Sequence, residues 1–196
     1  HTRYFYTKNS LTNNQSNETN IVYGEYQFIK QLKFMKELNV TGGVVMNQTY
    51  SHAELYNNGI SPDNHVKNFA GYAQFDKKLW NVLNATVGVR GEYYKLNSEQ
   101  EITKPILRSG LNLKLRQATW LRYSYGQGFR FPSITEKFIK TRTGGLDVFP
   151  NPDLQSETSW NTEIGLKQGF KVFNFMGFVD VSGFYQRYTN TIEYHT

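Results

Sequence analysis

The chain contains no cysteine, and only five prolines occur among its 196 residues. The absence of cysteine excludes a disulfide framework, a thiolate zinc site and an iron–sulfur cluster. A run of about 18 apolar residues is also absent, which excludes a transmembrane helix. A membrane β-barrel stays open, because its strands need only alternate apolar and polar residues.

Residue patterns typical of catalytic or metal sites are scarce. Four histidines occur, none of them at a ligand spacing, and His52 and His65 flank one long connection. A metal site across that connection is the alternative to our interpretation of both as solvated loop residues. GQG at residues 126–128 lacks the third glycine of a dinucleotide loop, since Phe131 takes its place, and no helix is expected after it. With no nucleophile and base at a defined spacing, we predict no enzyme, no metal and no cofactor.

The charge balance is basic but scattered. Twenty-two Lys and Arg residues against 16 Asp and Glu give a net charge of +6. Such a balance suits nucleic acid, anionic lipid or an acidic ligand. Because the basic residues do not cluster, they are interpreted as solvated faces, and no nucleic acid partner is expected.

Aromatic residues are abundant and the hydrophobic pattern has a period of two. Fourteen Tyr, 14 Phe and three Trp make 16% of the chain, and such residues favour strands. Residues 84–95, NATVGVRGEYYK, place Val87 and Val89 on one face and Arg90 and Glu92 on the other. A helix would repeat its apolar positions at three and four residues. The chain is therefore predicted to be all-β.

About nine antiparallel strands are predicted. Their segments are Tyr4 to Thr7, Ile21 to Leu32, Leu38 to Ser51, Phe69 to Phe75, Asn84 to Lys95, Ile106 to Arg116, Thr119 to Tyr125, Trp160 to Leu166 and Phe178 to Tyr194. The strand pattern continues almost to the last residue, which indicates that the sequence is a piece of a longer protein.

The connections alternate between short and long. Tight ones are expected near residues 33–37, 81–83, 117–118 and 169–173, and long ones near 9–20, 52–64, 97–104 and 127–156. An outer-membrane barrel has short periplasmic turns and long extracellular loops, so this ordering favours a transmembrane β-barrel.

The polar strand faces indicate a wet or plugged lumen rather than a dry core. Residues expected to face a ligand or a plug are Arg90, Glu92, Arg108, Asn112, Lys114 and Arg116. Aromatic residues near strand ends suit interfacial girdles or simply reflect β-propensity; they are Phe75, Trp80, Tyr93, Trp120, Tyr123 and Tyr125.

Two alternatives share parts of this pattern. A passive porin or small adhesin barrel has the same strands without a plug. A soluble β-sandwich that binds carbohydrate through surface aromatics would bury half of the apolar faces in a core.

Two segments resemble the barrel signature of TonB-dependent outer-membrane receptors of the Bacteroidetes type. YSYGQGFRFPSITEKF at residues 123–138 resembles the strand that ends in a Phe-Arg-x-Pro turn, and VFPNPDLQSETSWNTEIGLKQGF at 148–170 resembles the Asn-Pro-x-Leu-x-x-Glu segment that follows. The matching residues are Gly128, Phe129, Arg130, Pro132, Asn151, Pro152, Leu154, Glu157, Thr158, Asn161, Glu163 and Gly165.

The resemblance implies about nine strands of a barrel of about 22, with residues 1–196 forming a partial barrel that lacks the plug domain and the remaining strands. It also implies an outer-membrane receptor that imports a scarce nutrient with energy from the inner-membrane TonB complex. Ferric siderophores are the first expected ligands, followed by cobalamin, haem or oligosaccharides, and cations in the lumen favour an anionic one. The expected partners are this ligand, a metal chelate among the choices, the protein's own plug and outer-membrane lipid.

The same resemblance gives the stretch YGQGFRFPS a structural role. Gly126 and Gly128 are expected to let the strand leave the ladder and turn, and Pro132 to prevent renewed pairing. Arg130 is expected to pair with Glu157 or Glu163 of the neighbouring strand, or with the plug.

Overall fold

The computed structural model describes residues 2–9, 16–32, 38–56, 61–143 and 145–193. The predicted connection at residues 33–37 and the end of the last predicted strand at Tyr194 lie outside these residues. The elements are β1 (Thr2–Asn9), β2 (Asn17–Leu32), β3 (Leu38–Ala53), β4 (Asp63–Leu79), β5 (Leu83–Leu96), β6 (Glu99–Ile102), β7 (Ile106–Arg116), β8 (Thr119–Arg130), α1 (Ile134–Phe138), β9 (Thr141–Thr143), β10 (Leu146–Val148), β11 (Glu157–Val172) and β12 (Phe175–Thr189).

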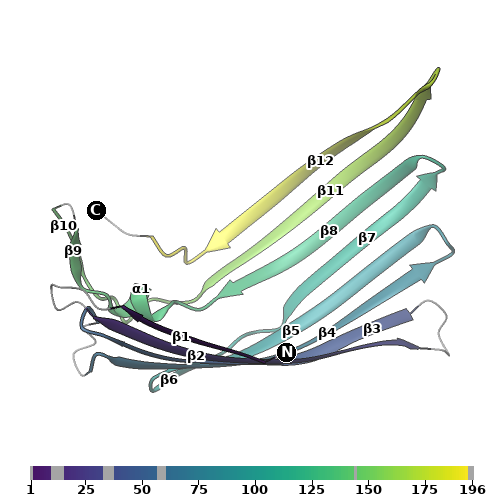
Figure 1. Cartoon of the computed structure of the whole chain (residues 1–196). Helices are drawn as coiled ribbons and strands as arrows, with labels where there is room; N and C mark the ends of the chain where they lie inside the picture. The colour runs from purple at the N-terminus through teal and green to yellow at the C-terminus, as the bar shows by residue number, and fades with distance from the viewer. Residues whose placement is uncertain (1, 10–15, 33–37, 57–60, 144, 194–196) are drawn as a thin grey trace.

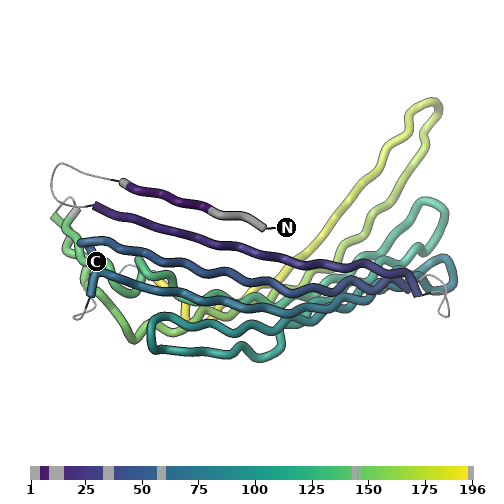
Figure 2. Tube along the Cα trace, turned by 60° about the horizontal axis from the view of Figure 1, so that its bottom comes forward, coloured from purple at the N-terminus to yellow at the C-terminus, as the bar shows by residue number. Residues whose placement is uncertain are grey.

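One curved antiparallel sheet makes up most of the chain. It contains ten strands in the order β1-β2-β3-β4-β5-β7-β8-β11-β12, with β6 paired to β5, and β9 and β10 form a separate two-stranded sheet. Figure 1 shows the sheet curling along its width like part of a barrel wall, and Figure 2 shows the same curl from a second direction. The prediction of an antiparallel barrel segment is confirmed. Within the described residues no second sheet packs on the face of the large sheet, so a β-sandwich is not the fold.

The two ends of the sheet differ. We call the end that carries α1, β9 and β10 the loop end, and the opposite end the turn end (Figure 1). At the turn end, the described connections are tight: β4 and β5 are joined by residues 80–82, β7 and β8 by 117–118, and β11 and β12 by 173–174. In outer-membrane barrels the short turns are periplasmic and the longer loops extracellular, so this rule predicts a periplasmic turn end and an extracellular loop end.

The described strands are longer than the sequence predicted. β4 runs over Asp63–Leu79 where only Phe69 to Phe75 was predicted, and β11 begins at Glu157 instead of Trp160. Most of the extra residues are polar, so hydrophobic alternation does not reveal them, yet their backbones continue the same ladders.

The connection predicted as long at residues 97–104 is instead a tight turn followed by β6. Asn97 adopts a left-handed φ of 53°, which asparagine tolerates better than most residues. Its backbone amide donates to the His65 carbonyl, and its side-chain oxygen accepts from the His65 amide, both at 2.8 Å. The strict alternation of short and long connections was therefore wrong at this hairpin.

Between β6 and β7 the ladder is interrupted near Pro105. The Glu92 carbonyl still accepts from the Thr103 amide at 2.9 Å, but the Glu92 amide donates to a side chain, Thr103 Oγ1, at 2.8 Å. A second irregularity lies between Lys114 and Arg116. The predicted alternation of β7 therefore holds only as far as Lys114.

The two faces of the sheet have opposite character. The convex face of β4 presents Phe69 and Phe75, both more than 40% exposed, with Gly71 and Ala73 between them. Lys67 and Lys77 bound this apolar stretch on the same face. Ten residues of strand rise about 33 Å, which at a barrel tilt of about 40° spans close to the apolar band of about 25 Å. This match supports a lipid-facing convex surface.

The predicted aromatic girdle is partly realised on that surface. Tyr93 lies 6.4 Å from Phe69, and Tyr125 lies 6.3 Å from Trp160, measured between ring centroids. Trp120 does not belong to the girdle, because it shares the concave face with Arg122 two residues later.

Within the described residues, no helix has the length and apolar character needed to cross a membrane.

The only compact apolar cluster among the described residues lies at the loop end. Leu96 of β5 packs there with Ile134 and Phe138 of α1, and partly buried Tyr94 and Val66 surround them. The core thus fixes a loop segment onto the concave wall and does not hold two layers together.

A pair of adjacent substitutions tests which face of the sheet contacts lipid. We expect Leu111→Arg, at the centre of β7 on the convex face, to destabilise the full-length protein by about 2–4 kcal/mol, because it places a charge in hydrocarbon. Asn112→Arg, one residue later on the concave face, should be tolerated. Equilibrium unfolding in lipid vesicles measures both; equal costs would mean that the faces are assigned wrongly.

Candidate functional site

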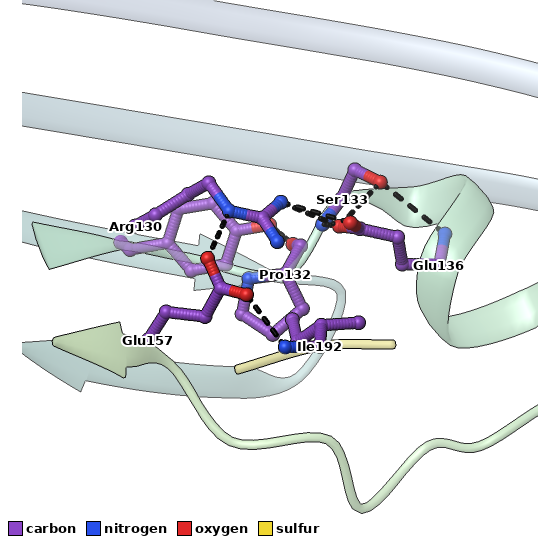
Figure 3. A network of polar contacts seen from close by, with 7 residues as sticks. Arg130, Pro132, Ser133, Glu136, Glu157 and Ile192 are labelled. Atoms are coloured by element: carbon purple, nitrogen blue, oxygen red, sulfur yellow. Dashed lines mark hydrogen bonds and ion pairs between the residues drawn. The ribbon is translucent and has the colours of Figure 1, made fainter. Parts of the chain in front are cut away.

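The stretch YGQGFRFPS ends at the loop end, where Arg130 is the last residue of β8. Its Nε donates to Glu157 Oε2 at 2.6 Å, and its Nη1 donates to both carboxylate oxygens of Glu136 at 2.9 Å. Glu157 opens β11 and Glu136 lies in α1. One guanidinium therefore ties the neighbouring strand and the helix to the end of β8 (Figure 3).

The expected pairing of Arg130 with Glu157 is confirmed, and the alternative partner, Glu163, lies six residues further along β11. Glu157 has a second role, because its other oxygen accepts the backbone amide of Ile192 at 2.6 Å. The segment that follows β12 is thus fastened to the same carboxylate. We call Arg130, Glu136 and Glu157 the mouth network.

The helix α1 begins with a capping box. Ser133 Oγ accepts from the Glu136 amide at 3.2 Å, and the Glu136 carboxylate accepts from the Ser133 amide at 2.8 Å. Two otherwise unpaired amides of the first turn are thereby satisfied. The expectation that no helix follows GQG was wrong, and the signature S-x-x-E at Ser133 was the signal that could have revealed it.

Further contacts hold the loop against the wall. Lys137 is buried and donates from Nζ to Glu99 of β6 at 2.6 Å. The Tyr94 hydroxyl donates to the Pro132 carbonyl at 3.0 Å, and the Phe131 ring stacks on Tyr94 with centroids 4.1 Å apart. Pro132 therefore sits where β8 has already ended, in agreement with its expected role.

Gly126 and Gly128 do not make the strand leave its ladder. They pair in register with Asn161 and Ser159 of β11, and β8 continues to Arg130. A Cβ at Gly126 would lie 2.8 Å from Asn161 Oδ1, and one at Gly128 would lie 2.5 Å from Ser159 Oγ. The glycines are needed because side chains of β11 cross over them, which corrects the predicted turning role.

The concave wall carries a second polar group around β4 and β5. Arg90 Nε donates to Glu92 Oε1 at 2.6 Å, and Asn68 donates to the other oxygen of Glu92 at 3.0 Å. The Arg90 guanidinium also lies 5.9 Å above the ring of Tyr72. Tyr72 in turn donates to Glu25 of β2 at 3.2 Å. Hydrogen bonds along this wall thus connect three strands.

A cavity of about 510 Å³ opens beside this group. Arg108 of β7 lines it together with Arg90 and Glu92. Among the described residues, Arg108 has no ion-pair partner, whereas Arg90 is already paired. Arg108 is therefore a cation that can meet an anionic group entering the lumen.

The other predicted lumen residues lie apart from this cavity. Asn112 lines a second hollow of about 340 Å³ together with Glu163 and Arg122. Lys114 and Arg116 lie at the turn end of β7, on either side of its irregularity. The structure thus brings together three of the six predicted residues and separates the rest.

The second half of the motif lies in the segment that leads from the loop back to β11. The Asn151 amide donates to the Lys137 carbonyl at 2.9 Å, and the Leu154 amide donates to the Asn151 carbonyl at 3.4 Å. Pro152 is exposed between them. Phe129 packs edge-on against Phe131, with ring centroids 4.8 Å apart. These residues position the chain for Glu157 to begin β11.

The two histidines lie at the loop end and are linked through Asp63 and Tyr50. His52 Nδ1 lies 2.7 Å from Asp63 Oδ1, which also accepts the Tyr50 hydroxyl at 2.7 Å. The His65 ring lies against Tyr50, with ring centroids 4.8 Å apart. Within the part of the chain that the structure describes, no group of three or more His, Asp or Glu residues is arranged to hold a metal ion.

Comparison with known proteins agrees with this geometry. A family model described as TonB dependent receptor-like, beta-barrel, matches residues 1–196. Haemoglobin-haptoglobin utilization protein B of Neisseria meningitidis is 29% identical over 108 residues, which cover 55% of this chain and 13% of that protein.

Two solved structures share the fold. The siderophore receptor PirA from Pseudomonas aeruginosa aligns with a TM-score of 0.71 at 17% identity, over 89% of this chain and 33% of that one. The Serratia marcescens hemophore receptor HasR, solved with its hemophore HasA and heme, aligns with a TM-score of 0.65 at 16% identity, over 88% and 34%. The chain therefore spans about a third of these structures and a smaller share of the sequence relative.

Removal of the guanidinium tests the mouth network. We expect Arg130→Gln to raise hydrogen exchange of residues 134–138 about tenfold in the full-length protein, because two carboxylates lose their charged donor. Glu163→Gln, on the same face of β11 but outside the network, is the control and should leave that exchange unchanged. Equal exchange in Arg130→Gln and the unaltered protein would contradict the anchoring role.

The mouth network should also depend on pH. Partial burial acts to raise the pKa of Glu136, but hydrogen bonds from Ser133 and Arg130 outweigh it and hold the pKa below its ordinary value. The carboxylate therefore stabilises the folded mouth above its unfolded pKa of about 4.3, and this stabilisation is lost as the pH falls through the lower folded pKa.

Exchange of residues 134–138, corrected for its intrinsic pH dependence, should rise as the pH falls below about 4. In Glu136→Gln that rise should be absent. A rise of equal size in Glu136→Gln would show that a different carboxylate controls the helix.

Proposed function

Because the chain belongs to the TonB-dependent receptor β-barrel family, we propose that it forms part of the barrel wall of an outer-membrane receptor that imports a scarce nutrient with energy from TonB. The single observation that carries the proposal is the polar concave wall, which at its loop end holds a segment that the mouth network fastens. A plug domain in the complete protein and the inner-membrane TonB complex are the partners that this activity needs.

We propose an anionic iron-containing ligand, a ferric siderophore or haem. The unpaired Arg108 and the paired Arg90 support it, since both face the cavity of about 510 Å³. The structural neighbours PirA and HasR are receptors for a siderophore and for a haem carrier, and the sequence relative is a haemoglobin-haptoglobin utilization protein. Cobalamin and oligosaccharides have less support, because neither requires cations in the lumen.

A passive porin-like barrel is the competing function, and it predicts transport without an energy source. The match of residues 1–196 to the TonB-dependent receptor family argues against it. Enzymatic activity is not part of the proposal, since transport needs only binding and release.

Uptake assays separate these possibilities. Cells that express the full-length protein should accumulate a radiolabelled ferric siderophore or haemin, and accumulation should fall to background when TonB is deleted. Uptake that persists without TonB would identify a passive pore and refute the proposal.

A substitution in the cavity tests the ligand class. We expect Arg108→Gln to raise the dissociation constant for the transported anion on the order of tenfold, because one charged hydrogen bond is lost. Lys77→Gln, on the convex face, is the matched control and should bind like the unaltered protein. Binding that is insensitive to Arg108→Gln would remove this residue from the binding site.

A further inference from the structure

Two lysines stand side by side on the convex face near the loop end. Lys67 of β4 and Lys95 of β5 are register partners, so their side chains leave the sheet on the same face about 5 Å apart. Like charges directly opposite each other destabilise a sheet. Among the described residues, neither ammonium group has an ion-pair partner.

The acidic residues of β5 and β6 do not neutralise these lysines because they occupy the concave face. Glu92 is taken by Arg90, Glu99 by Lys137, and Glu101 by the Ser156 hydroxyl at 2.6 Å. The carboxylates of β5 and β6 therefore have their partners on the concave face, whereas Lys67 and Lys95 lie on the convex face.

The lysines also sit at a defined depth. Two residues closer to the turn end, Phe69 and Tyr93 face each other on the same surface, with ring centroids 6.4 Å apart. Aromatic girdles mark the boundary between hydrocarbon and headgroups, and long basic side chains just beyond them reach the headgroup layer. Both lysines therefore lie at headgroup level in the external leaflet.

Amide side chains extend the lysine pair into a row across four strands. Gln48 of β3 is the register partner of Lys67, and Gln100 of β6 is the register partner of Lys95. The Gln100 side-chain oxygen accepts from the Tyr93 hydroxyl at 3.3 Å, which leaves its amide nitrogen as a donor. We call Gln48, Lys67, Lys95 and Gln100 the donor row.

We propose that the donor row binds the phosphate of a phosphorylated lipid headgroup in the external leaflet. One phosphate between the two ammonium groups removes their repulsion and accepts several charge-assisted hydrogen bonds. The acyl chains of the same lipid then lie along the apolar convex surface below Phe69 and Tyr93. This inference uses the membrane orientation of the barrel and does not depend on the transported nutrient.

Lipid titration of the full-length protein, followed by native mass spectrometry, tests the proposal. Diphosphorylated lipid A is the probe, and the measured quantity is its apparent dissociation constant. Lys67→Gln and Lys95→Gln should each weaken binding about fivefold, and the double variant about thirtyfold. Lys77→Gln, on the same strand and face but at the turn end, should bind like the unaltered protein.

Two further probes identify the recognised group. Lipid A without phosphates should bind the unaltered protein as weakly as the double variant binds the phosphorylated form. Inorganic phosphate at the same concentration should not displace lipid A, because it lacks the acyl contacts.

Equal affinity of the double variant and the unaltered protein for lipid A would overturn the proposal. Equal affinity for the dephosphorylated lipid would overturn it as well. Displacement by inorganic phosphate would replace the lipid site with a general anion site. Because each substitution removes a repulsive charge from the outer surface, the lysine variants should unfold at or slightly above the temperature of the unaltered protein, so weaker binding cannot be attributed to loss of the fold.

Discussion

The requirement that every backbone amide and carbonyl be satisfied inside a membrane governs this structure. Lipid offers no hydrogen-bond partner, so strands can cross only as a continuous ladder. The ladder in turn imposes a period of two, which sends alternate side chains to lipid and to the lumen. The separation of Val87 and Val89 from Arg90 and Glu92 follows from that period. The same requirement means that β1 and β12, each paired on one side in the described sheet, need further strands beside them in a bilayer.

Where the ladder is irregular, side chains replace the missing backbone partners. Thr103 Oγ1 accepts the Glu92 amide beside Pro105, and Asn97 pairs with both backbone groups of His65. Both irregularities lie near the loop end. Glu157 does the same for the Ile192 amide at the end of the sheet. Side-chain capping therefore satisfies these three amides where the strands end or bend.

Much of this fold could be predicted from the sequence because alternation survives in the membrane-spanning part of each strand. Outside the apolar band, where Lys67 and Glu157 continue their strands, polarity no longer alternates and the strands appeared too short. The helix α1 has five residues, too few for a helical period, and only its capping box marks it. The role of Gly126 and Gly128 depends on side chains about 33 residues away in β11, which local sequence does not reveal.

The candidate site could also be predicted only in part from the sequence. Which cations can bind a ligand depends on their burial and on their ion-pair partners, and the sequence shows neither. Arg130, the most recognisable residue of the motif, donates hydrogen bonds to Glu136 and Glu157 and so holds the loop end together. Arg108 has no such partners and remains available to a ligand. Lys67 and Lys95 remain available on the opposite face. A cation without a carboxylate partner keeps its full attraction for anions. One layer of strands therefore presents unpaired cations both to the lumen, at Arg108, and to the outer leaflet, at Lys67 and Lys95.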